Sequence, residues 1–226
     1  MEISTRLLAV MAELAIIPAV IEDKKIREIF NRISDTHAIN SYTTIADGHV
    51  QMSSKKNGTS YQIMRDRIVL NYEFCDNSLN YYAGMIRDFM DVFYKATAIN
   101  LFLVQNIGIR KLVNMGSVDG RDYLIKQVFS MTDENLKFFE RPLHMIGARI
   151  FFPAVEGRDM VSYEVKFESS MEDFKTLFIE NKGTFPAAID MRKPSDIGES
   201  ISKTDEFINK NMLQFLSQFS HGGSKK

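Results

Sequence analysis

Apolar and polar residues alternate along one long stretch of the chain, residues 100–116, which reads NLFLVQNIGIRKLVNMG. Its odd-numbered positions are apolar at Leu101, Leu103, Ile107, Ile109 and Val113. Its even-numbered positions are small or polar at Asn106, Gly108, Arg110 and Asn114. Because successive side chains of a strand point to opposite faces of a sheet, this pattern predicts a strand with one buried and one available face. A strand of this length is long enough to join two halves of a sheet.

Before this strand, the hydrophobic pattern predicts a strand, a helix, an antiparallel meander and a second helix. The strand covers about residues 5–17 and stops before Pro18. The segment 21–34 repeats isoleucine at helical spacing and carries charged i,i+4 pairs on its other side. Short alternating runs follow between 41 and 74, with turn chemistry at KKNG, 55–58. Asp76 or Ser78 can cap the next helix, and an apolar stripe predicts that it is buried on the sheet, at Leu79, Tyr82, Ile86, Phe89 and Phe93.

After the long strand, the pattern predicts a helix from about Asp119, an irregular segment to Pro142, a set of strands and a last helix. The strands are expected within 145–155, 160–170, 174–181 and 185–191, separated by turn chemistry at EGRD, 156–159, and NKGT, 181–184. The last helix is expected from near Ser195, with an apolar face at Ile197, Ile201, Ile208, Met212, Phe215 and Phe219.

The two parts of the chain therefore share one order of elements. We predict an α+β fold in which two similar strand-helix-meander-helix halves form a largely antiparallel curved sheet with helices packed on one side. The first half spans 1–98 and the second spans 99–220, together as one compact unit. Residues 221–226, glycine-rich and polar, are expected to form a disordered tail.

Net charge and composition limit the classes of partner that the chain is expected to bind. The chain has 28 basic and 29 acidic side chains and a net charge of −1, whereas a nucleic-acid-binding protein usually carries a basic excess. Local basic pairs such as Arg110 and Lys111 leave nucleic acid open as a partner. The apolar run near the N-terminus is interrupted by Glu13 and is too short to cross a bilayer, so we expect no membrane contact. A single cysteine, Cys75, excludes an internal disulfide and favours a cytoplasmic protein.

Motifs for catalysis or cofactor binding do not occur in the sequence. The histidines lack a second histidine or cysteine at the spacing of zinc sites, at His37, His49, His144 and His221. Neither glycine-rich phosphate-binding motif occurs, and no serine lies in a G-x-S-x-G setting. We predict no catalytic residue, no metal and no cofactor, and we favour a non-enzymatic role while leaving the question of catalysis open.

One polar cluster follows the long strand. Arg110 and Asn114 lie on its available side, Lys111 is their neighbour in the sequence, and Arg121 and Asp122 begin the next helix. Backbone N–H groups at the start of a helix favour an anion, so these five are our candidate binding residues for an acidic partner or ligand. The simpler interpretation is a network of arginine and aspartate side chains that holds the strand to the helix.

Short motifs give the chain a resemblance to a known family. They are GIRKLVN at 108–114, GRDYL at 120–124 and AAIDM at 187–191, followed by a closing helix that runs to a phenylalanine. In these motifs, and in outline over about residues 5–219, the chain resembles a sporadically distributed prokaryotic domain family of unknown function. The resemblance implies a shared fold and a prokaryotic origin, and it implies no catalytic residue. At Lys111 the chain departs from the apolar or aromatic residue that the resemblance leads us to expect.

The function that we predict is a non-enzymatic binding or adaptor subunit of a prokaryotic multi-protein system, such as phage or mobile-element defence. The sheet face without helices, including Arg110 and Asn114, would take a protein partner, and edge strands would allow a homodimer.

Two alternatives stay open. The first is a nucleic-acid-binding protein or a metal-independent ribonuclease, for which His49, Tyr42 and Tyr61 would share one sheet face and Arg110 and Arg149 would share one face. The second is a small-ligand-binding module whose pocket lies between the two halves.

Overall fold

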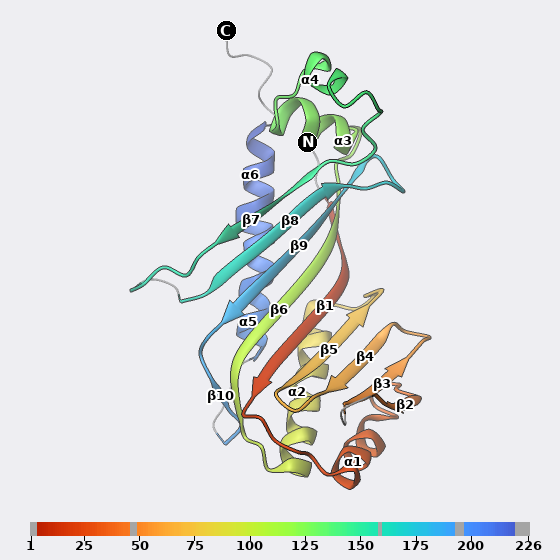
Figure 1. Cartoon of the computed structure of the whole chain (residues 1–226), viewed down its shortest axis with the longest axis vertical. Coiled ribbons are helices and arrows are strands. Elements are labelled where there is room, and N and C mark those ends of the chain that lie inside the picture. Colours follow the sequence, from red (N-terminus) through yellow and green to blue (C-terminus); the bar gives the residue numbers. More distant parts are fainter. Residues whose placement is uncertain (1–3, 46–48, 158–159, 193–196, 220–226) are drawn as a thin grey trace.

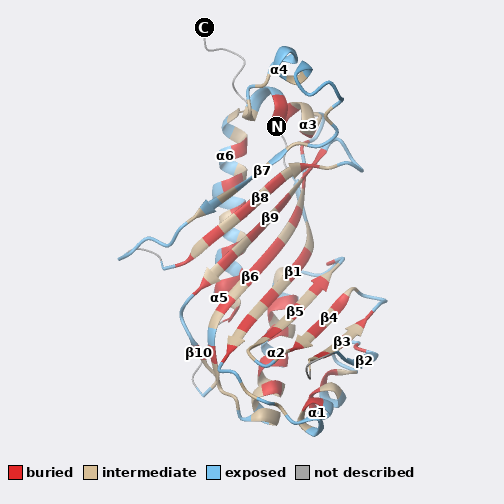
Figure 2. Ribbon diagram, viewed as in Figure 1, coloured by how far each residue is buried: buried red, intermediate tan, exposed pale blue. Residues whose placement is uncertain are grey.

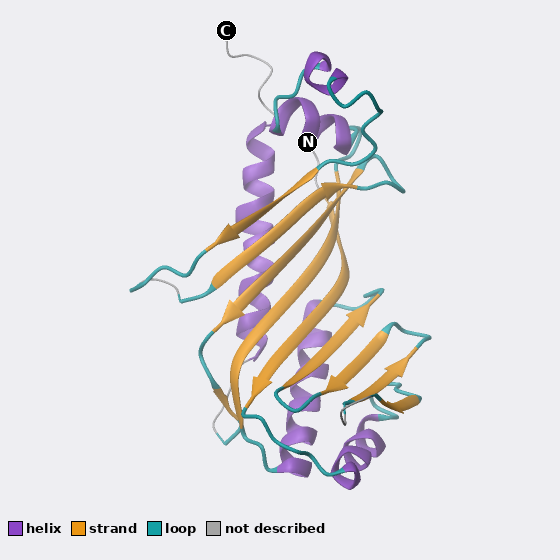
Figure 3. Cartoon of the chain, in the orientation of Figure 1, coloured by secondary structure: helices purple, strands orange, loops and turns teal. Residues whose placement is uncertain are grey.

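The computed structural model describes residues 4–45, 49–157, 160–192 and 197–219. Within them the chain has an α+β fold built on one open, antiparallel ten-stranded sheet (Figures 1 and 3). The strands lie in the order β2-β3-β4-β5-β1-β6-β9-β8-β7, and β10 pairs with the beginning of β6. Their bounds are β1 Ser4–Ile16, β2 Ser41–Thr44, β3 Val50–Ser54, β4 Thr59–Ile63, β5 Arg67–Glu73, β6 Leu101–Asn114, β7 Gly147–Phe152, β8 Ser162–Ser169, β9 Thr176–Phe185 and β10 Ile189–Asp190.

The long helices pack against one side of the sheet. In Figure 1, α2 and the continuous rod formed by α5, η3 and α6 pass behind the strands, and α1 packs beside α2. We call the side of the sheet that carries these helices the covered face, and the opposite side the uncovered face. The helical bounds are α1 Asp23–Ile33, α2 Leu79–Thr97, α3 Gly120–Tyr123, π-helical η2 Leu124–Val128, α4 Asp133–Lys137, α5 Ile197–Glu206, π-helical η3 Phe207–Met212 and α6 Leu213–Gln218.

The central strand β6 confirms most of the predicted alternation. Ile107, Ile109 and Val113 are fully buried on the covered face, whereas Arg110 and Asn114 lie on the uncovered face. Figure 2 shows the same alternation of buried and half-buried residues along most strands of the sheet. A period of two therefore does correspond to one helix-packed side and one free side.

At the beginning of β6 the predicted side was wrong. Phe102 is buried and Leu103 is exposed, the opposite of the predicted order. The reason is a β-bulge: Ala15 pairs with Val104, but the next residue of β1, Ile16, pairs with Phe102. Leu103 is the extra residue, so every side chain before it changes face.

Helix α2 forms where the sequence predicts it, because both its start and its buried stripe are specified locally. The Ser78 hydroxyl accepts a hydrogen bond from the Tyr81 N–H at 3.3 Å, which caps the first turn. The stripe of Tyr82, Ile86, Phe89 and Phe93 is buried against the sheet. Burial of each such side chain contributes about 2 kcal/mol, so the stripe fixes the helix on the covered face.

Strand β9 corrects a second prediction. The sequence NKGT, 181–184, was expected to be a turn, but it lies inside the ten-residue strand β9. Gly183 serves close packing rather than a turn, since a Cβ there would lie 2.7 Å from the Phe185 ring and 2.8 Å from the Thr204 hydroxyl. Asn181 is fully buried and its Nδ2 donates to the Thr204 carbonyl at 2.8 Å. Both residues bring α5 close to the sheet.

The two predicted halves meet in one continuous sheet. β1 pairs with β5 on one side and with β6 on the other, and β6 pairs with β9. The antiparallel pair β1 and β6 lies between strands β2 to β5 on one side and strands β7 to β9 on the other. The predicted tail, 221–226, lies outside the described residues.

Candidate binding surface

The uncovered face is a continuous layer of side chains arranged in rows across the strands. One row crosses from β5 to β7 through Glu73, Ala9, Arg110, Glu180, Lys166 and Arg149. The next row runs from β2 to β7 through Ser41, Ser53, Ser60, Asn71, Met11, Gly108, Lys182, Glu164 and Phe151. A third row contains Thr43, Gln51, Gln62, Val69, Glu13, Asn106, Thr184 and Ser162. No described helix packs on this side (Figure 1).

Charged side chains dominate the second half of the uncovered face, and they pair with one another. Arg110 Nε donates to Glu180 Oε2 at 2.7 Å, and Lys182 Nζ lies 3.2 Å from Glu180 Oε1. Burial alone would raise the pKa of Glu180, but these two cations outweigh it and hold the pKa below its ordinary value. Glu180 therefore stays ionised, and it neutralises part of the positive charge that a polyanion would need.

The same pairing recurs toward the β7 edge. Lys166 Nζ lies 2.8 Å from Glu168, and Arg149 Nε lies 3.5 Å from Glu164. Such exposed pairs are worth well under about 1 kcal/mol each to stability. Their effect is on the charge of the surface, because the carboxylate beside each of these cations offsets its positive charge.

The first half of the uncovered face is neutral and polar. Hydroxyl and amide side chains occupy it over β2, β3, β4 and part of β5, at Ser41, Thr43, Gln51, Ser53, Ser60, Gln62 and Asn71. Charged residues appear only near its border with β1, where Arg67 lies 3.0 Å from Glu13 and Asn71 donates to Glu73 at 3.3 Å. This half presents donors and acceptors without net charge.

The two halves of the face meet at a shallow centre. Two small residues, Ala9 and Gly108, leave a depression of about 10 Å³, and Met11, Asn71 and Arg110 lie around it. That volume holds about one water molecule. The centre of the face therefore suits contact with a broad surface and is too small for an organic ligand.

Lys111, which was predicted together with Arg110 as a binding residue, is not part of the uncovered face. It lies on the covered face and is only 7% exposed. Its Nζ lies 2.6 Å from Asp205 Oδ1 and donates to Asn209 Oδ1 at 3.0 Å. The parity of the strand decides this placement: position 111 is odd, like the buried Ile109 and Val113. The apolar residue that we expected at this position would face the same buried layer.

The remaining predicted residues are divided between different surroundings. Asn114 is at the end of β6, where its Oδ1 accepts from the Gly116 N–H at 2.7 Å and closes a turn. Arg121 lies with its guanidinium 5.3 Å from the centre of the Phe174 ring and donates to the Leu143 carbonyl. Arg121 thus has partners separate from those of Arg110, and the structure does not join them in one cluster.

The start of α3 also differs from the predicted anion site. The Asp119 carboxylate accepts a hydrogen bond from the Asp122 N–H at 2.9 Å, so a side chain of the protein caps this helix. Asp122 itself pairs with Lys126 at 3.1 Å. These contacts fit the interpretation that the acidic and basic residues here hold local structure.

The residues weighed for ribonuclease chemistry fall on different faces. Arg110 and Arg149 do share the uncovered face, in one row. Tyr42 and Tyr61 share the covered face, since both are in register with Met52, and Tyr61 is fully buried. A substrate in contact with the two arginines would therefore lie on the other side of the sheet from these tyrosines.

A chain of hydrogen bonds in the first half resembles a catalytic relay in its residue types. His37 lies 2.5 Å from the Tyr61 hydroxyl and 2.8 Å from the Asp88 carboxylate, and Tyr61 lies 2.8 Å from the Tyr72 hydroxyl. Burial lowers the pKa of His37 and raises the pKa of both tyrosines. His37, Tyr61 and Tyr72 are at most 2% exposed, so a substrate could not reach them, and their role is to satisfy one another's polar groups.

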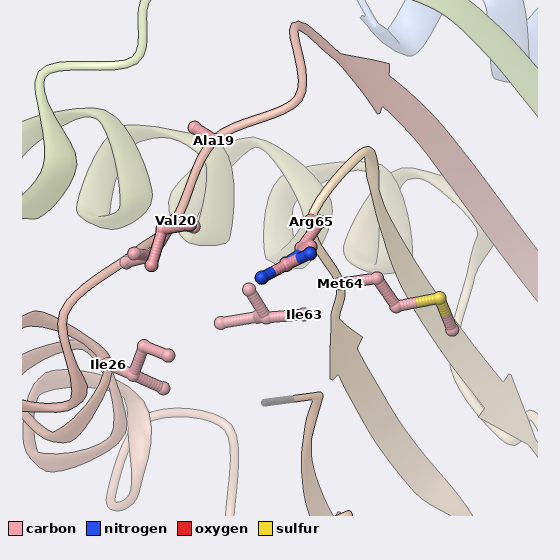
Figure 4. A pocket seen from close by; sticks show the side chains of 7 residues that line it. Ala19, Val20, Ile26, Ile63, Met64 and Arg65 are labelled. Carbon is pink, nitrogen blue, oxygen red and sulfur yellow. The ribbon is translucent and has the colours of Figure 1, made fainter. Parts of the chain in front are cut away.

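Two cavities lie away from the uncovered face. One, of about 410 Å³, opens between the β7–β8 connection and the α5–η3 helix and is lined by Phe152, Tyr163, Phe207 and neighbouring residues. Another, of about 100 Å³, is lined by Ala19, Val20, Ile26, Ile63, Met64 and Arg65 (Figure 4). Each belongs to one half, whereas the predicted ligand pocket was placed between the halves.

The sequence reasoning missed Glu180, Lys182, Met11 and Asn71. Alternation in the run FIENKGT contains the signal for Glu180 and Lys182, but its asparagine and glycine favoured a turn instead. Met11 and Asn71 lie in strands that were predicted, and only the pairing of β1 with β5 and β6 brings them beside Arg110. Pairing across strands is the information that a single sequence does not contain.

Within the described residues, no three histidine, cysteine or acidic side chains are grouped so that they could hold a metal ion. No described helix combines the length and the apolar character needed to cross a membrane. No protein-family model matches the chain, and no curated protein matches it. The resemblance to a sporadic prokaryotic family stays a prediction.

Proposed function

We propose that the protein is a non-enzymatic binding subunit that docks a protein partner on the uncovered face of its sheet. The observation that carries the proposal is the extent of that face: three rows of side chains cross the strands on the side away from the helices, and one of them runs without interruption from β2 to β7. Antiparallel sheets often leave one face to solvent, so an uncovered face alone does not indicate binding. This sheet has more strands than is usual, and its uncovered face is correspondingly broad enough to contact a protein.

The chemistry of the face indicates the kind of partner. Arg110, Lys182, Lys166 and Arg149 each lie beside a carboxylate, so the second half offers both signs of charge in alternation. The first half offers amides and hydroxyls. A protein surface of mixed polarity satisfies both halves, whereas a nucleic acid backbone would meet Glu180, Glu164 and Glu168 along with the cations.

Photo-crosslinking on the two sides of the sheet tests this proposal. A photoreactive benzoylphenylalanine is placed at Asn71 or Lys182 on the uncovered face, and at Glu199 on the exposed side of α5 as the control. In cells of the source organism, we expect one and the same protein to be crosslinked from both face positions and not from Glu199. The crosslinked protein is then purified and titrated with the wild-type chain.

Two variants complete that experiment. Met11→Glu adds a charge at the centre of the face and is expected to weaken binding of the identified protein at least tenfold, which is about 1.4 kcal/mol. Glu199→Gln leaves the face unchanged and is expected to bind as the wild type does. Equal binding by both variants, or crosslinks only from Glu199, would contradict the proposal.

Nucleic acid is the first alternative occupant of the same face. Fluorescence anisotropy with labelled single-stranded RNA and duplex DNA, over a range of salt concentrations, decides it. Affinity that falls steeply with salt and is lost in the Arg110→Ala, Lys182→Ala double variant would replace the protein partner by a polyanion. We expect no such binding, because the cations of the face already have acidic neighbours.

The 410 Å³ cavity supports a second candidate function, the binding of a small aromatic ligand that carries polar groups, because the cavity lining also includes Lys203, Glu206 and Lys210. Its volume falls in the usual range for ligand pockets, and the rings of Tyr163 and Phe207 stack at 4.2 Å in its wall. A thermal-shift screen with flat aromatic compounds tests it. Stabilisation that is lost in Phe207→Ala would support this function, and no stabilisation by any compound would remove it.

The wider setting rests on the sequence alone. We propose that the partner belongs to a prokaryotic multi-protein system, such as phage or mobile-element defence, and that the protein acts in the cytoplasm. We also propose that the two halves are related by duplication, because each contributes one central strand and a meander to a common face. Identification of neighbouring genes and of the crosslinked protein tests the setting directly.

A further inference from the structure

Strand β7 forms one edge of the sheet and leaves a row of backbone groups unpaired by other described strands. The Ser169 N–H donates to the Ile146 carbonyl at 2.9 Å, so even-numbered residues in this register direct their backbone groups toward β8. The odd-numbered residues Gly147, Arg149 and Phe151 therefore direct their N–H and C=O groups to the free edge. Such an edge is a template for another strand.

We propose that β7 pairs antiparallel with β7 of a second copy of this chain, with Ile150 on the twofold axis. In this register Arg149 of each copy lies opposite the partner's Phe151, and the two residues exchange backbone hydrogen bonds. Ala148 lies opposite the partner's Phe152, and the two Ile150 side chains meet. A twofold axis perpendicular to the sheet keeps both uncovered faces on the same side.

The side chains of β7 are complementary to themselves in this register. On the uncovered face, Arg149 and Phe151 are each about two-thirds exposed in the single chain, and the pairing sets a guanidinium beside an aromatic ring twice. On the covered face, a small alanine meets a large phenylalanine twice, and isoleucine meets isoleucine. Aromatic and β-branched cross-strand pairs are favourable ones.

Neighbouring registers lack this complementarity. A shift that centres the axis on Arg149 would set the two guanidinium groups directly opposite one another on one face, which is unfavourable. A shift that centres it on Phe151 would bring Arg149, in the middle of the strand, opposite Pro153, which has no N–H to donate. In the Ile150 register Pro153 lies opposite Gly147 instead, at the end of the pairing. The register through Ile150 satisfies the outward backbone groups of Arg149 and Phe151 in both copies.

The opposite edge of the sheet, formed by β2, is shorter and more polar than the β7 edge. β2 has only four residues, Ser41–Thr44, and its exposed side chains are hydroxyls. Pairing of β7 with a β2 edge would join copies head to tail into an open filament, whereas β7 with β7 closes after two copies. The contrast between the two edges therefore favours a dimer.

Disulfide trapping tests the register. In a chain with Cys75→Ala, the variant Ile150→Cys puts two thiols in a directly opposed, non-hydrogen-bonded pair, whose Cα atoms lie about 4.5 Å apart. That separation suits a disulfide. With oxidised glutathione as the acceptor of the two electrons and two protons, we expect a covalent dimer from Ile150→Cys and none from Phe151→Cys. Trapping from Phe151→Cys but not from Ile150→Cys would overturn the register.

A charge exchange tests the interface without covalent chemistry. Phe151→Lys sets a lysine opposite the partner's Arg149 in both contacts, so the dimer dissociation constant in sedimentation equilibrium should rise about tenfold or more. Adding Arg149→Glu to that variant should restore the dimer, since the opposed charges then attract. Thr43→Lys, on the β2 edge, is the control and should leave the constant unchanged.

The proposal is overturned if the wild-type chain sediments as a monomer up to its solubility limit. It is also overturned if Phe151→Lys and Thr43→Lys have the same effect. Because these variants lie at the edges of the sheet, partner binding by the Met11 region of the uncovered face is measured separately. The failure of one proposal thus does not imply the failure of the other.

Discussion

The two halves of the sheet bury different chemistry beneath their helices. In the first half, the polar groups of the covered face form a neutral chain of one imidazole and two tyrosine hydroxyls that ends at the half-exposed Asp88. In the second half, the covered face contains an ion pair between Lys111 and Asp205, which are 9% and 18% exposed in their side chains. The first arrangement depends on His37 remaining neutral, and the second depends on keeping two opposite charges together.

The uncovered face shows the same contrast in a different form. Its first half carries amides and hydroxyls, and its second half carries ion pairs centred on Glu180. We infer that charge in the second half is arranged chiefly to satisfy other charges of the same chain. Recognition of a partner then depends on shape and on mixed polarity across both halves.

The largest effect is expected at the buried ion pair. Lys111→Ala should lower the free energy of unfolding by about 3 kcal/mol, because Asp205 would remain in a largely buried place without its cation. Urea denaturation measures this. The double variant Lys111→Met, Asp205→Asn should recover most of the loss, since no uncompensated charge remains. A single variant as stable as the wild type would show that the pair is not a structural element of the second half.

The next effect compares the two faces at neighbouring glycines of β6 and β9. Gly183→Ala should lower the free energy of unfolding by about 2 kcal/mol, since its new methyl group would collide with Phe185 and Thr204 on the covered face. Gly108→Ala should change stability by no more than about 0.5 kcal/mol. The nearest atom to its methyl group would be the end of the flexible Met11 side chain, 3.1 Å away, and the next two, Met11 Cβ and Lys182 Cγ, lie at ordinary contact distances of 3.5 and 3.9 Å. Thermal and urea denaturation of the pair measure the difference. Equal losses would mean that the uncovered face is packed as tightly as the covered one.

The third effect is a pH dependence of the free energy of unfolding that comes from the first half. Burial lowers the pKa of His37 in the folded state below 6.5, the ordinary pKa of histidine. As the pH falls below about 6.5, the unfolded chain therefore binds a proton at His37 before the folded chain does. Stability from His37 is therefore fully present above about pH 6.5 and is lost as the pH falls toward its lower folded-state pKa. The slope is at most about 1.4 kcal/mol per pH unit.

Urea denaturation between pH 7.5 and 5.5 measures this slope. The variant His37→Gln should lose most of it, and Lys111→Met with Asp205→Asn should keep it, because that pair lies in the second half. An unchanged slope in His37→Gln would show that another group titrates in this range.

The smallest effect is expected on the uncovered face. Arg110→Ala breaks the pair with Glu180, but Arg110 is 42% exposed and Glu180 keeps Lys182 beside it, so the free energy of unfolding should fall by less than about 1 kcal/mol. Binding of the crosslinked partner should weaken all the same. A loss of stability as large as that of Lys111→Ala would mean that Arg110 is a structural residue and not a contact residue.

Much of this architecture was predictable from local patterns. The α+β class, the helix capped by Ser78 and the alternation around Ile107 and Ile109 follow from spacing and capping, which act over a few residues. The bulge at Leu103 was not predictable, because it is set by the pairing of β1 with β6. NKGT was read as a turn for its composition, although Gly183 is there to let α5 approach the sheet.

The candidate surface was predictable only in part. Arg110 follows from parity along its own strand, and the same parity argues against Lys111. Glu180 could have been found by extending the strand through NKGT. The neutral half of the face could not have been placed beside Arg110 from the sequence. Its position depends on the order of the strands in the sheet, which the pattern within each strand does not specify.

The most direct test of the central claim measures which side chains of β6 solvent can reach. In a chain with Cys75→Ala, single cysteines replace Asn106, Arg110, Ile107 and Ile109 in turn, and their rates of alkylation are compared under native conditions. A free face predicts fast reaction at 106 and 110 and strong protection at 107 and 109. Equal protection at all four positions would mean that both faces are covered and would contradict the account.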